Sequence, residues 1–539
     1  MSEIALRTTA VGRATVKPNL DQKPHVSAAL VFVLLLVCGI GYAAYGIFTD
    51  TSNVGEPLAI GALVLLGIAL IIALGFEFVN GFHDTANAVA TVIYTHSLPP
   101  LAAVIWSGLF NFVGVVVSGG AVAYGIITLL PVELILQVGS AGGYAMIFSL
   151  LIAAIVWNLG TWAMGIPNSS SHALIGSIMG VGIANELMAP AGQATSGVDW
   201  SQAVNVGEAL LFSPVVGFIL SALLLLLMKV VVPVQKLYQE PTDEKTPWWI
   251  RAILIFTCTG VSFAHGGNDG QKGMGLIMLI LIGVAPTAYA LNRTMPDSST
   301  PAFIEATRKA QAIFSAHAEG APQVNAESAR TRIGSALKTR ELNNPDVYAA
   351  LASLSGEIAN EVKDYGSIRR VPAAATQNMR NDMYLVSDAT RLLLQAGATY
   401  NADATTSLKE YRAQLDASTR FIPTWVKVSV AIALGLGTMI GWKRIVVTVG
   451  ERIGKQHLTY AQGASAEMVA AGTILGAEFY GLPVSTTHIL ASGVAGTMAA
   501  NGSGLQWSTV QAIALAWILT LPAAMLIAGC LYFFSRHLF

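Results

Sequence analysis

Two long apolar stretches of this chain are interrupted in their middle by charged and amide side chains, and these interruptions limit what the chain can fold into more than any other feature. The first stretch spans residues 76–94, and the second is interrupted at residues 264–273. The polar side chains are Glu77, His83, Asp84 and Asn87 in the first stretch and His265, Asn268, Asp269 and Lys272 in the second. An ionisable group within a bilayer is costly unless it faces a cavity lined by protein, so these side chains are functional candidates.

The composition places the chain among polytopic membrane proteins. Of its 539 residues, 54% are hydrophobic and only 11% are charged, whereas soluble proteins carry about 25% charged residues. The formal net charge of −1 gives no reason to expect nucleic acid as a partner, because nucleic-acid binding calls for a clustered basic surface. The three cysteines, Cys38, Cys258 and Cys530, lack a metal-binding spacing, so we interpret them as small buried hydrophobic residues.

Apolar runs predict membrane helices along most of the chain. They lie at residues 28–48, 58–94, 101–128, 143–164, 168–185, 207–232, 252–291, 424–442, 463–480, 485–500 and 508–533. The run at residues 252–291 is too long for one straight perpendicular span, so we expect a broken or strongly tilted helix there. The first run is too long for a signal peptide, and basic residues precede it, so we expect an uncleaved helix and a cytoplasmic N-terminus.

A polar segment of mixed charge separates two membrane parts and predicts a small helical soluble insertion. Lys and Arg cluster in the N-terminal tail and in the loops at residues 229–251 and 443–455, which we place in the cytoplasm, with the insertion on the opposite side. The expected organisation is a tail with an extra membrane helix (1–56), a first membrane repeat (57–235), the start of a second repeat (236–291), the insertion (292–420) and the remainder of the second repeat (421–539).

The two halves carry the same two motifs in the same order. The second motif, Gly-x-Pro-x-Ser-x-x-His-x-Leu, occurs at residues 165–174 and again at 481–490. Counted from the aspartate to the first serine, the motifs lie 85 positions apart in the first half and 216 in the second, and the difference, 216 − 85 = 131, is close to the length of the insertion. The loop that precedes the first aspartate motif has no basic residues, whereas the loop that precedes the second is basic. We therefore expect inverted repeats with a substrate site between them near the bilayer midplane.

The Ser/Thr-rich motif predicts the start of a helix in each half, because Ser and Thr are favoured N-caps. Free backbone N–H groups and the positive end of the helix dipole make such a start an anion site. Two converging copies would present six hydroxyls, from Ser169, Ser170, Ser171, Ser485, Thr486 and Thr487. One copy alone would indicate an ordinary cap in an interfacial loop, whereas the repetition favours an oxyanion site.

The two aspartates would repel a dianion unless a proton or a cation lies with them, so Asp84 and Asp269 indicate coupling to one of these ions. An aspartate also accepts a hydrogen bond from protonated phosphate, which would help to distinguish phosphate from fully ionised sulfate. The alternative is a structural aspartate that bonds to backbone or pairs with Lys272, whose ammonium suits the substrate and Asp269 equally well. Asn87 and Asn268 are suited to orienting substrate or ion, or to capping a helix.

The buried histidines and glutamates leave several roles open. His83 is the candidate for proton handling, because it adjoins the first aspartate and an imidazole ordinarily titrates near neutral pH. His172 and His488 are interpreted as structural hydrogen-bonding groups. Glu77 and Glu467 are interpreted as secondary sites or as polar groups in helix packing.

These motifs together resemble the inorganic phosphate transporter family, the Pit family. The resemblance rests on residues 81–91, 265–273 and 483–488 and extends to residues 157–162 and 459–463. It implies an all-α polytopic membrane protein, an inverted-repeat transporter with broken helices and Ser/Thr-tipped hairpins. It also implies a secondary transporter of inorganic phosphate rather than an enzyme, with the Asp/Asn and Ser/Thr motifs of both repeats lining the site. A bacterial low-affinity phosphate permease of this kind would lie in the bacterial inner (cytoplasmic) membrane.

The sequence departs from the sodium-coupled members, whose motif reads Gly-Ala-Asn-Asp-Val-Ala-Asn in both halves. His83 stands at the position of the first Asn, and Lys272 replaces the final Asn of the second copy. Imidazole and ammonium are poor partners for a hard cation that prefers oxygen ligands. We therefore predict proton symport of phosphate, carried alone or as a neutral metal-phosphate complex. The alternatives are sodium-coupled phosphate transport and a sulfate or other oxyanion permease of the same fold.

The predicted coupling groups are His83, Asp84 and Asp269, and the predicted partners are inorganic phosphate, protons and the lipid bilayer. We expect no resident cofactor or metal, although a divalent cation co-transported with phosphate and a homo-oligomer are both compatible with the sequence. An intramembrane hydrolase is disfavoured, because the Ser-rich motif lacks a nucleophile elbow and catalytic sites rarely occur as matched copies. A receptor-like role of the insertion stays open.

Overall fold

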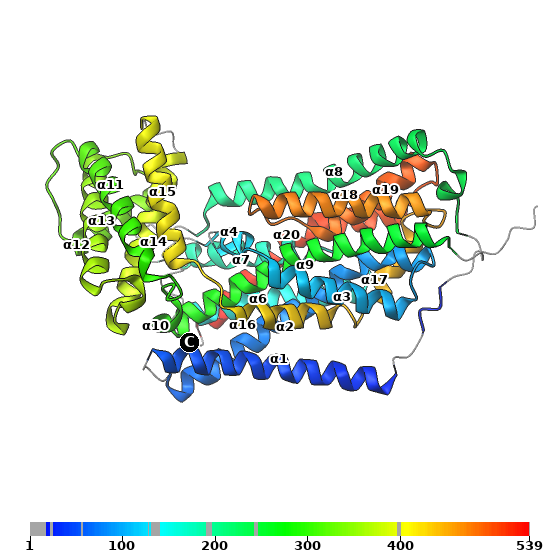
Figure 1. The fold of residues 1–539 in the computed structure, drawn as a ribbon, viewed down its shortest axis with the longest axis horizontal. Helices are drawn as coiled ribbons and strands as arrows, with labels where there is room; N and C mark the ends of the chain where they lie inside the picture. Colours follow the sequence, from blue (N-terminus) through cyan, green and yellow to red (C-terminus); the bar gives the residue numbers. More distant parts are fainter. Residues whose placement is uncertain are drawn as a thin grey trace, which may run out of the picture.

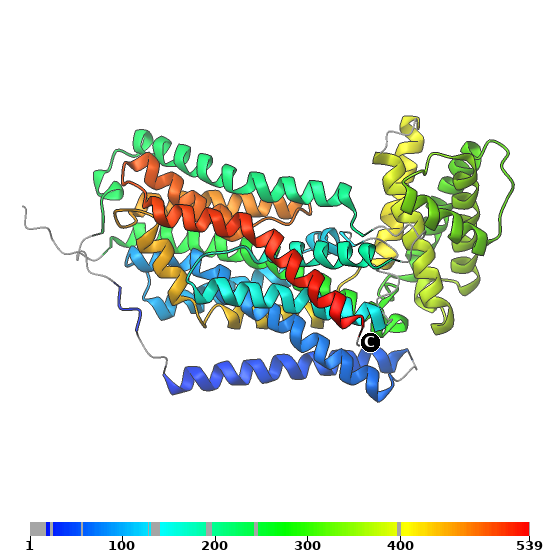
Figure 2. The ribbon, with the colours of Figure 1, turned by 180° about the vertical axis from the view of Figure 1, so that it is seen from behind.

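The computed structural model describes residues 18–21, 25–54, 58–127, 129–130, 141–189, 197–241, 246–395 and 400–537. Apart from one isolated bridge between Gly454 and Leu505, the regular elements that it describes are helices. A long bundle of helices makes up most of the molecule, and the shorter helices α11 to α15 form a separate cluster at one end of the bundle (Figures 1 and 2).

The helices follow the predicted apolar runs closely. The first membrane part contains α1 (Val26–Asn53), α2 (Ile60–Tyr94), α3 (Pro100–Val117), α4 (Ala121–Ile127), α6 (Ala141–Ala163), α7 (Ser170–Leu187) and α8 (Trp200–Val231). The second contains α9 (Trp248–Val284), α10 (Pro286–Tyr289), α16 (Thr424–Gly437), α17 (Lys443–Val447), α18 (Tyr460–Phe479), α19 (Thr486–Asn501) and α20 (Trp507–Ser535). The insertion contains α11 (Thr300–His317), α12 (Ala326–Thr339), α13 (Pro345–Tyr365), α14 (Ala373–Gln395) and α15 (Ala402–Thr419).

Seven helices in the described part of the chain, α1, α2, α3, α6, α8, α9 and α20, are long and apolar enough to cross a membrane. The helices α15 and α16, which meet at an angle of 74°, would add an eighth span if they are taken as one broken unit. The hairpin helices α7, α18 and α19 are less apolar, because they carry the small and polar residues of the repeated motifs.

The aspartate-bearing stretches are continuous helices. α2 contains 35 residues and α9 contains 37, so at about 1.5 Å per residue each exceeds the roughly 30 Å hydrocarbon core. The expected break in residues 252–291 lies at Ala285, between α9 and α10, and leaves the polar part of α9 continuous. Further breaks lie between α3 and α4, where Gly120 has a φ of 94°, and between α16 and α17, where Gly441 has a φ of 72°.

Helices of the first and second membrane parts pack against each other reciprocally. α2 packs against α16 and α3 against α9, and in the same way α7 packs against α20 and α8 against α19. Glycines permit the closest approaches: a Cβ at Gly81 would lie 2.3 Å from the carbonyl oxygen of Leu434, and one at the equivalent Gly266 would lie 2.1 Å from that of Asn111. Small residues at such crossings are typical of membrane helices. Each half thus completes the packing of the other.

The equivalent helices α2 and α9 run in opposite directions. Glu77, which precedes the aspartate of α2 by seven residues, lies against Gly273, which follows the aspartate of α9 by four. Beyond the aspartates, Thr91 of α2 and Thr257 of α9 both donate hydrogen bonds to Glu467 of α18. Thr91 follows its aspartate whereas Thr257 precedes its own, so the two helices are antiparallel along their shared interface.

The insertion is anchored to the first membrane part by ion pairs. Asp199, immediately before α8, accepts hydrogen bonds from Arg340 and Arg391 of the insertion, each at 2.9 Å. Arg391 also contacts Asp388 at 2.6 Å, and the side chains of Asp199 and Arg391 are only 7% and 9% exposed. We call these four residues the Asp199 clamp. Because the chain itself joins the insertion to α10 and α16, the insertion is attached to both membrane parts.

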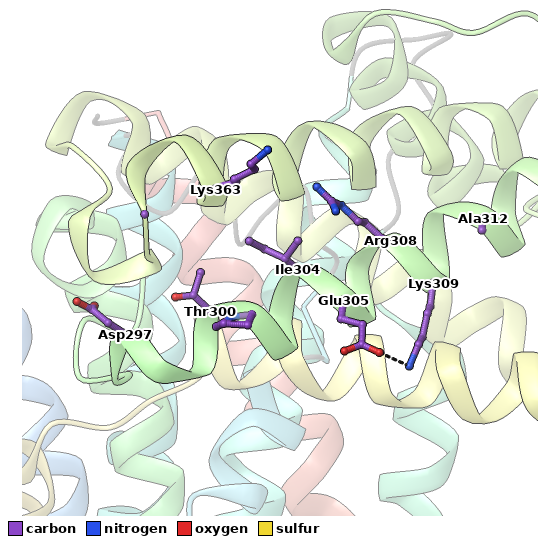
Figure 3. A pocket seen from close by; sticks show the side chains of 10 residues that line it. Asp297, Thr300, Ile304, Glu305, Arg308, Lys309, Ala312 and Lys363 are labelled. Carbon is purple, nitrogen blue, oxygen red and sulfur yellow. Dashed lines mark ion pairs between the residues drawn. The ribbon is translucent and has the colours of Figure 1, made fainter.

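An open groove of about 790 Å³ runs along α11 and the end of α13 in the insertion (Figure 3). Its wall carries charges of both signs, including Glu305 and Lys309, which form an ion pair at 2.8 Å. Their side chains are 68% and 51% exposed, and exposed pairs of this kind contribute little to stability. We interpret the groove as a solvated helix surface.

Replacing Arg391 with Gln should weaken the attachment of the insertion. The change leaves the buried carboxylate of Asp199 with one cation fewer, and loss of one partner from a buried ion pair costs about 3 kcal/mol. Thermal unfolding and limited proteolysis of the purified protein should show a lower Tm and faster cleavage within residues 292–420. The control Arg332→Gln removes only an exposed pair with Asp346 and should cost less than about 1 kcal/mol. The same Tm in wild type and R391Q would contradict the role of the clamp.

Candidate functional site

Two helix hairpins, α6–α7 and α18–α19, have tips with the same conformation. At each tip a glycine, Gly165 or Gly481, adopts a positive φ of 69° or 67°, which glycine accommodates without steric strain. The N–H of each glycine closes the preceding helix by donating to the carbonyl of Trp162 or Glu478, each at 2.9 Å. The repeated sequence motif therefore folds into a repeated structure.

The expected helix starts are present at both tips. Ser169 caps α7 by accepting a hydrogen bond from the N–H of His172 at 3.2 Å, and Ser485 caps α19 by accepting one from the N–H of His488 at 3.1 Å. Both serines are 1% exposed. Their hydroxyls are thus engaged in capping, and they hold the first turns of α7 and α19 in place.

One hydroxyl of each tip connects to the aspartate of the other half. Thr487 of the second half donates to the carboxylate of Asp84 at 2.6 Å. Its counterpart in the first half, Ser171, accepts a hydrogen bond from the ammonium of Lys272, which lies 2.7 Å from the carboxylate of Asp269. The connection is direct in one half and passes through a lysine in the other. The structure thus pairs Lys272 with Asp269, one of the two roles that the sequence left open.

The remaining two hydroxyls have no hydrogen-bond partner among the described residues. Ser170 and Thr486 occupy equivalent positions in the two tips, and their side-chain oxygens are buried without a hydrogen-bond partner in the part of the chain that the structure describes. Ser170 is 0% and Thr486 6% exposed. Buried polar groups are nearly always hydrogen-bonded, and leaving one unpaired is unfavourable. A polar ligand at the tips would supply the missing partner for both.

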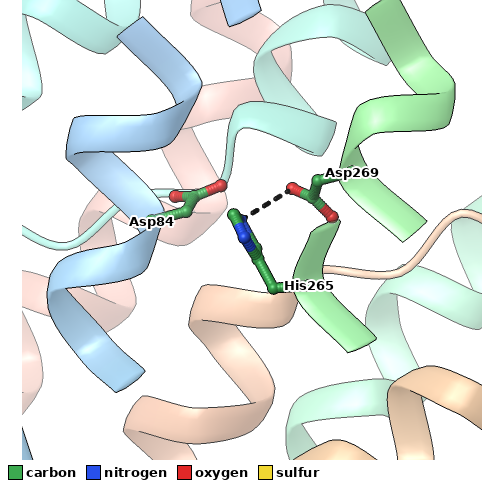
Figure 4. A group of neighbouring side chains, drawn as sticks. All are labelled: Asp84, His265 and Asp269. Atoms are coloured by element: carbon green, nitrogen blue, oxygen red, sulfur yellow. Dashed lines mark ion pairs between the residues drawn. The ribbon is translucent and has the colours of Figure 1, made fainter. Parts of the chain in front are cut away.

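The two aspartates meet at one place together with a histidine. One ligand atom each from Asp84, His265 and Asp269 lies within 4.8 Å of the other two (Figure 4). Nε2 of His265 is 3.6 Å from the carboxylate of Asp269, and its Nδ1 is 2.6 Å from the side-chain oxygen of Asn111. All of these side chains are buried. The cluster therefore brings α2, α3 and α9 to one point inside the bundle.

The other predicted polar residues surround this cluster. Nδ1 of His83 lies 3.3 Å from the carboxylate of Asp84, and its Nε2 lies 3.3 Å from the hydroxyl of Thr161. Asn268 donates to the carbonyl of Leu482 at 3.2 Å, while its side-chain oxygen is buried without a partner among the described residues. The helix position of Asn87 is described, but its side chain lies outside the described residues.

His172 and His488 contact each other between the two hairpin tips. Their ring centroids are 4.6 Å apart, and the ring of His488 also stacks on Trp517 at 4.0 Å. Nδ1 of His172 is 2.9 Å from the hydroxyl of Ser169, whereas Nε2 of His488 is buried without a hydrogen-bond partner in the described part of the chain. The contact of His172 with Ser169 fits its interpretation as a structural hydrogen-bonding group, whereas His488 is held by ring stacking.

Glu467 is bonded on both oxygens. It accepts hydrogen bonds from Thr91 on α2 and, at 2.5 Å, from Thr257 on α9. It is completely buried on α18. Of the two readings of this acid, the contacts fit a polar group that joins three packed helices.

His265 was not among the residues that we assigned to the site from the sequence. Its spacing of four residues before Asp269 places both side chains on one face of a helix, and this spacing was the available signal. Asn111, which holds the other ring nitrogen of His265, lies 154 positions away on α3. No pattern in the sequence connects residues that far apart on different helices.

The site offers groups that bind anions and groups that bind cations or protons side by side. Hydroxyls of Ser170 and Thr486, the ammonium of Lys272 and the N-terminal N–H groups of α7 and α19 are suited to oxyanions. The carboxylates of Asp84 and Asp269 are suited to a proton or a cation. A tetrahedral oxyanion that travels with a proton or a cation would use both sets.

Comparison with known proteins identifies the family. The model described as the phosphate transporter family matches residues 80–528. The chain belongs to this family. It is 41% identical over 502 residues to the low-affinity inorganic phosphate transporter PitA of Escherichia coli K12, covering 89% of this chain and 98% of PitA. It is 38% identical over 504 residues to PitB of the same organism, covering 90% of this chain and 99% of PitB.

More distant relatives extend the comparison. A probable low-affinity inorganic phosphate transporter of Bacillus subtilis is 28% identical over 478 residues, covering 88% of this chain and 99% of that protein. A solved structure described as the sodium-dependent phosphate transporter matches with a TM-score of 0.49 and 20% identity, covering 88% of this chain and all of that one. The resemblance to the Pit family is thus confirmed, and the chain is a multi-pass membrane transporter rather than an enzyme.

Replacing Ser170 with Ala or Thr486 with Val should weaken phosphate binding by this Pit-family transporter without destabilising it. Each change removes a hydroxyl that has no hydrogen bond within the described part of the chain. A hydrogen bond to a charged ligand contributes about 1.5–3 kcal/mol, so its loss should raise KM roughly 10- to 100-fold. Uptake of labelled phosphate into proteoliposomes over a range of concentrations measures KM.

The control for this prediction is Ser177→Ala on the same helix as Ser170. The hydroxyl of Ser177 donates to the carbonyl of Ala173 at 2.8 Å within α7, so the variant should keep the wild-type KM. Wild-type KM in the Ser170 and Thr486 variants as well would show that these hydroxyls do not contact phosphate.

Proposed function

We propose that this transporter imports inorganic phosphate by proton symport, with the phosphate held between the tips of the two hairpins. The observation that carries the proposal is the pair of unpartnered hydroxyls on Ser170 and Thr486 beside the buried Asp84 and Asp269. Phosphate near neutral pH has oxygens that accept hydrogen bonds and at least one O–H that donates. It therefore suits hydroxyl donors and carboxylate acceptors at once, whereas fully ionised sulfate has no proton to donate.

The proposed substrate-binding residues come from both halves of the chain. They are Asp84, Asn87, Ser169, Ser170 and Ser171 in the first half and Asn268, Asp269, Lys272, Ser485, Thr486 and Thr487 in the second. In this arrangement Ser170 and Thr486 donate to the phosphate oxygens and Lys272 adds a positive charge. Ser169 and Ser485 act through the helix starts that they cap, which present backbone N–H groups to the anion.

Movement of one half against the other would expose the site to each side of the membrane in turn. The antiparallel course of α2 and α9, the matching hairpin tips and the reciprocal packing of the two halves support an inverted repeat. In inverted-repeat transporters the substrate site lies between the repeats near the bilayer midplane. Phosphate would enter from the extracytoplasmic side and leave to the cytoplasm after the halves rock.

The aspartates would bind a cation that offsets the negative charge of phosphate. Asp84, Asp269 and His265 present two carboxylates and an imidazole within 4.8 Å of one another, which is a donor set that divalent metal ions accept. A divalent cation carried as part of a metal-phosphate complex would fit here as substrate, between the carboxylates and the anion. It would offset the repulsion between phosphate and the two acids.

Two nitrogen groups beside the aspartates favour protons over sodium as the coupling ion. Lys272 lies 2.7 Å from Asp269, and His83 lies 3.3 Å from Asp84. Ammonium and imidazole occupy carboxylate oxygens that a hard cation would need as ligands. His83, Asp84 and Asp269 are therefore the proposed proton-coupling groups.

The proposed location is the inner membrane of a bacterium. The N-terminus would lie in the cytoplasm and the insertion at residues 292–420 in the periplasm, because the loops on the opposite side of the bundle from the insertion carry clusters of Lys and Arg. This orientation places the hairpin tips within the bilayer and α11 to α15 outside it.

Asp84→Asn and Asp269→Asn should each abolish phosphate accumulation or uncouple it from protons while leaving membrane insertion intact. Asn keeps the shape of the side chain but has no negative charge to attract a proton or a cation. Uptake of labelled phosphate, normalised to the amount of protein in the membrane, measures the effect. Asp346→Asn in the insertion, where the side chain is 60% exposed, is the control and should behave as wild type. Normal uptake by both site variants would remove the aspartates from the mechanism.

A pH gradient with the acidic side outside should drive phosphate accumulation by the purified protein in proteoliposomes, and a sodium gradient alone should not. The reason is that Lys272 and His83 contact the carboxylate oxygens that sodium, a hard cation, would need as ligands. The measurement is uptake with pH, sodium and magnesium varied independently, and dependence on magnesium would indicate a metal-phosphate complex. Strong accumulation under a sodium gradient without a pH gradient would contradict proton coupling.

A further inference from the structure

A third buried acid, Glu77, lies on the face of α2 that carries Asp84, but outside the cluster of Asp84, His265 and Asp269. Glu77 precedes Asp84 by seven residues, which is about two helical turns or roughly 10 Å along the axis. Glu77 is 0% exposed. A buried acid inside a membrane bundle indicates a functional group unless its charge is paired.

The carboxyl of Glu77 fits into a space that α9 leaves open for it. A Cβ at Gly273 would lie 2.5 Å from Oε1 of Glu77 and 2.3 Å from its Cγ, so any other residue at this position would displace the acid. On α2, Nδ2 of Asn80 lies 3.4 Å from Oε2 of Glu77. Oε1 of Glu77 and Oδ1 of Asn80 are both buried without a hydrogen-bond partner among the described residues.

The charged side chains that act most strongly on Glu77 are those of Asp269 and Lys272, both on α9. The helices α3 and α6, which also pack against α2, carry no charged residue. The titratable side chains on the other elements packed against α2 are His172, Glu186, Lys427, Lys443, Arg444, Glu451, Arg452, Glu467, Glu478 and His488.

Lys272 adjoins Gly273, against which Glu77 packs, but its ammonium is bonded to Asp269 and Ser171. An ionised Glu77 would therefore hold an uncompensated charge and an unpaired oxygen inside the bundle, which is unfavourable. A proton on Oε1 removes this charge.

We propose that Glu77, in addition to the coupling groups at the aspartates, binds a proton that travels with phosphate. The inference rests on the proton symport proposed above and names a carrier group outside the phosphate contacts. A proton from water on the extracytoplasmic side forms an O–H bond with Oε1 of Glu77, and this bond breaks when the site opens to cytoplasmic water, which takes the proton.

The test separates proton-driven accumulation from phosphate exchange in proteoliposomes. Glu77→Gln should lose accumulation driven by a pH gradient, because an amide cannot bind and release the proton. It should keep exchange of labelled internal for unlabelled external phosphate, because the phosphate contacts at the hairpin tips are intact and exchange moves no net proton. Glu77→Asp, which keeps a titratable group, should restore part of the accumulation.

Glu305→Gln in the insertion is the matched control, since the side chain of Glu305 is 68% exposed, and it should accumulate phosphate like wild type. Accumulation by E77Q at the wild-type level, or loss of both accumulation and exchange by well-inserted E77Q, would overturn the assignment of Glu77. If E77Q does not reach the membrane, Gly273→Ala serves instead, because its Cβ would displace the Glu77 carboxyl and should produce the same split. Failure of the wild type to respond to a pH gradient would overturn proton symport, and the role of Glu77 with it.

Discussion

The contact on which the structure most depends is the buried ion pair of Lys272 and Asp269. Both side chains are 0% exposed, and their charged atoms are 2.7 Å apart. An ammonium in this position is tolerable only because it also donates to Ser171 at the tip of the first hairpin. The pair therefore connects a helix of the second half to a hairpin of the first. The hydrogen bond from Thr487 to Asp84 makes the reciprocal connection.

Close helix packing makes these two connections possible. Gly81 and Gly266, each three residues before an aspartate, bring α2 against α16 and α9 against α3 with backbone nearly touching backbone. The polar groups of the site can then bond across the interface instead of facing lipid, which lacks hydrogen-bonding groups.

Much of the fold and part of the site could be predicted from the sequence. Apolar runs located the helices, and the repeated Gly-Pro-Ser-His motif located both hairpin tips, because caps and glycine turns are set by local chemistry. The sequence could not distinguish Ser170 and Thr486 from the other hydroxyls, since their lack of partners depends on where other helices lie. His265 joined the cluster through Asn111 on α3, and the attachment of Asp199 to Arg340 and Arg391 involves distant segments. Such long-range pairings follow from packing and not from local pattern.

The packing of helices from one half against helices from the other affects how the protein assembles during synthesis. During synthesis α7 and α8 enter the bilayer before α19 and α20 exist, yet these later helices are the ones against which they pack. The polar tip of the first hairpin therefore lies in the membrane with its serines unburied until the ribosome has also synthesised the soluble insertion at residues 292–420. Assembly of the bundle is in this sense a late event, and a chain cut short before α19 would leave α7 and α8 without the helices against which they pack.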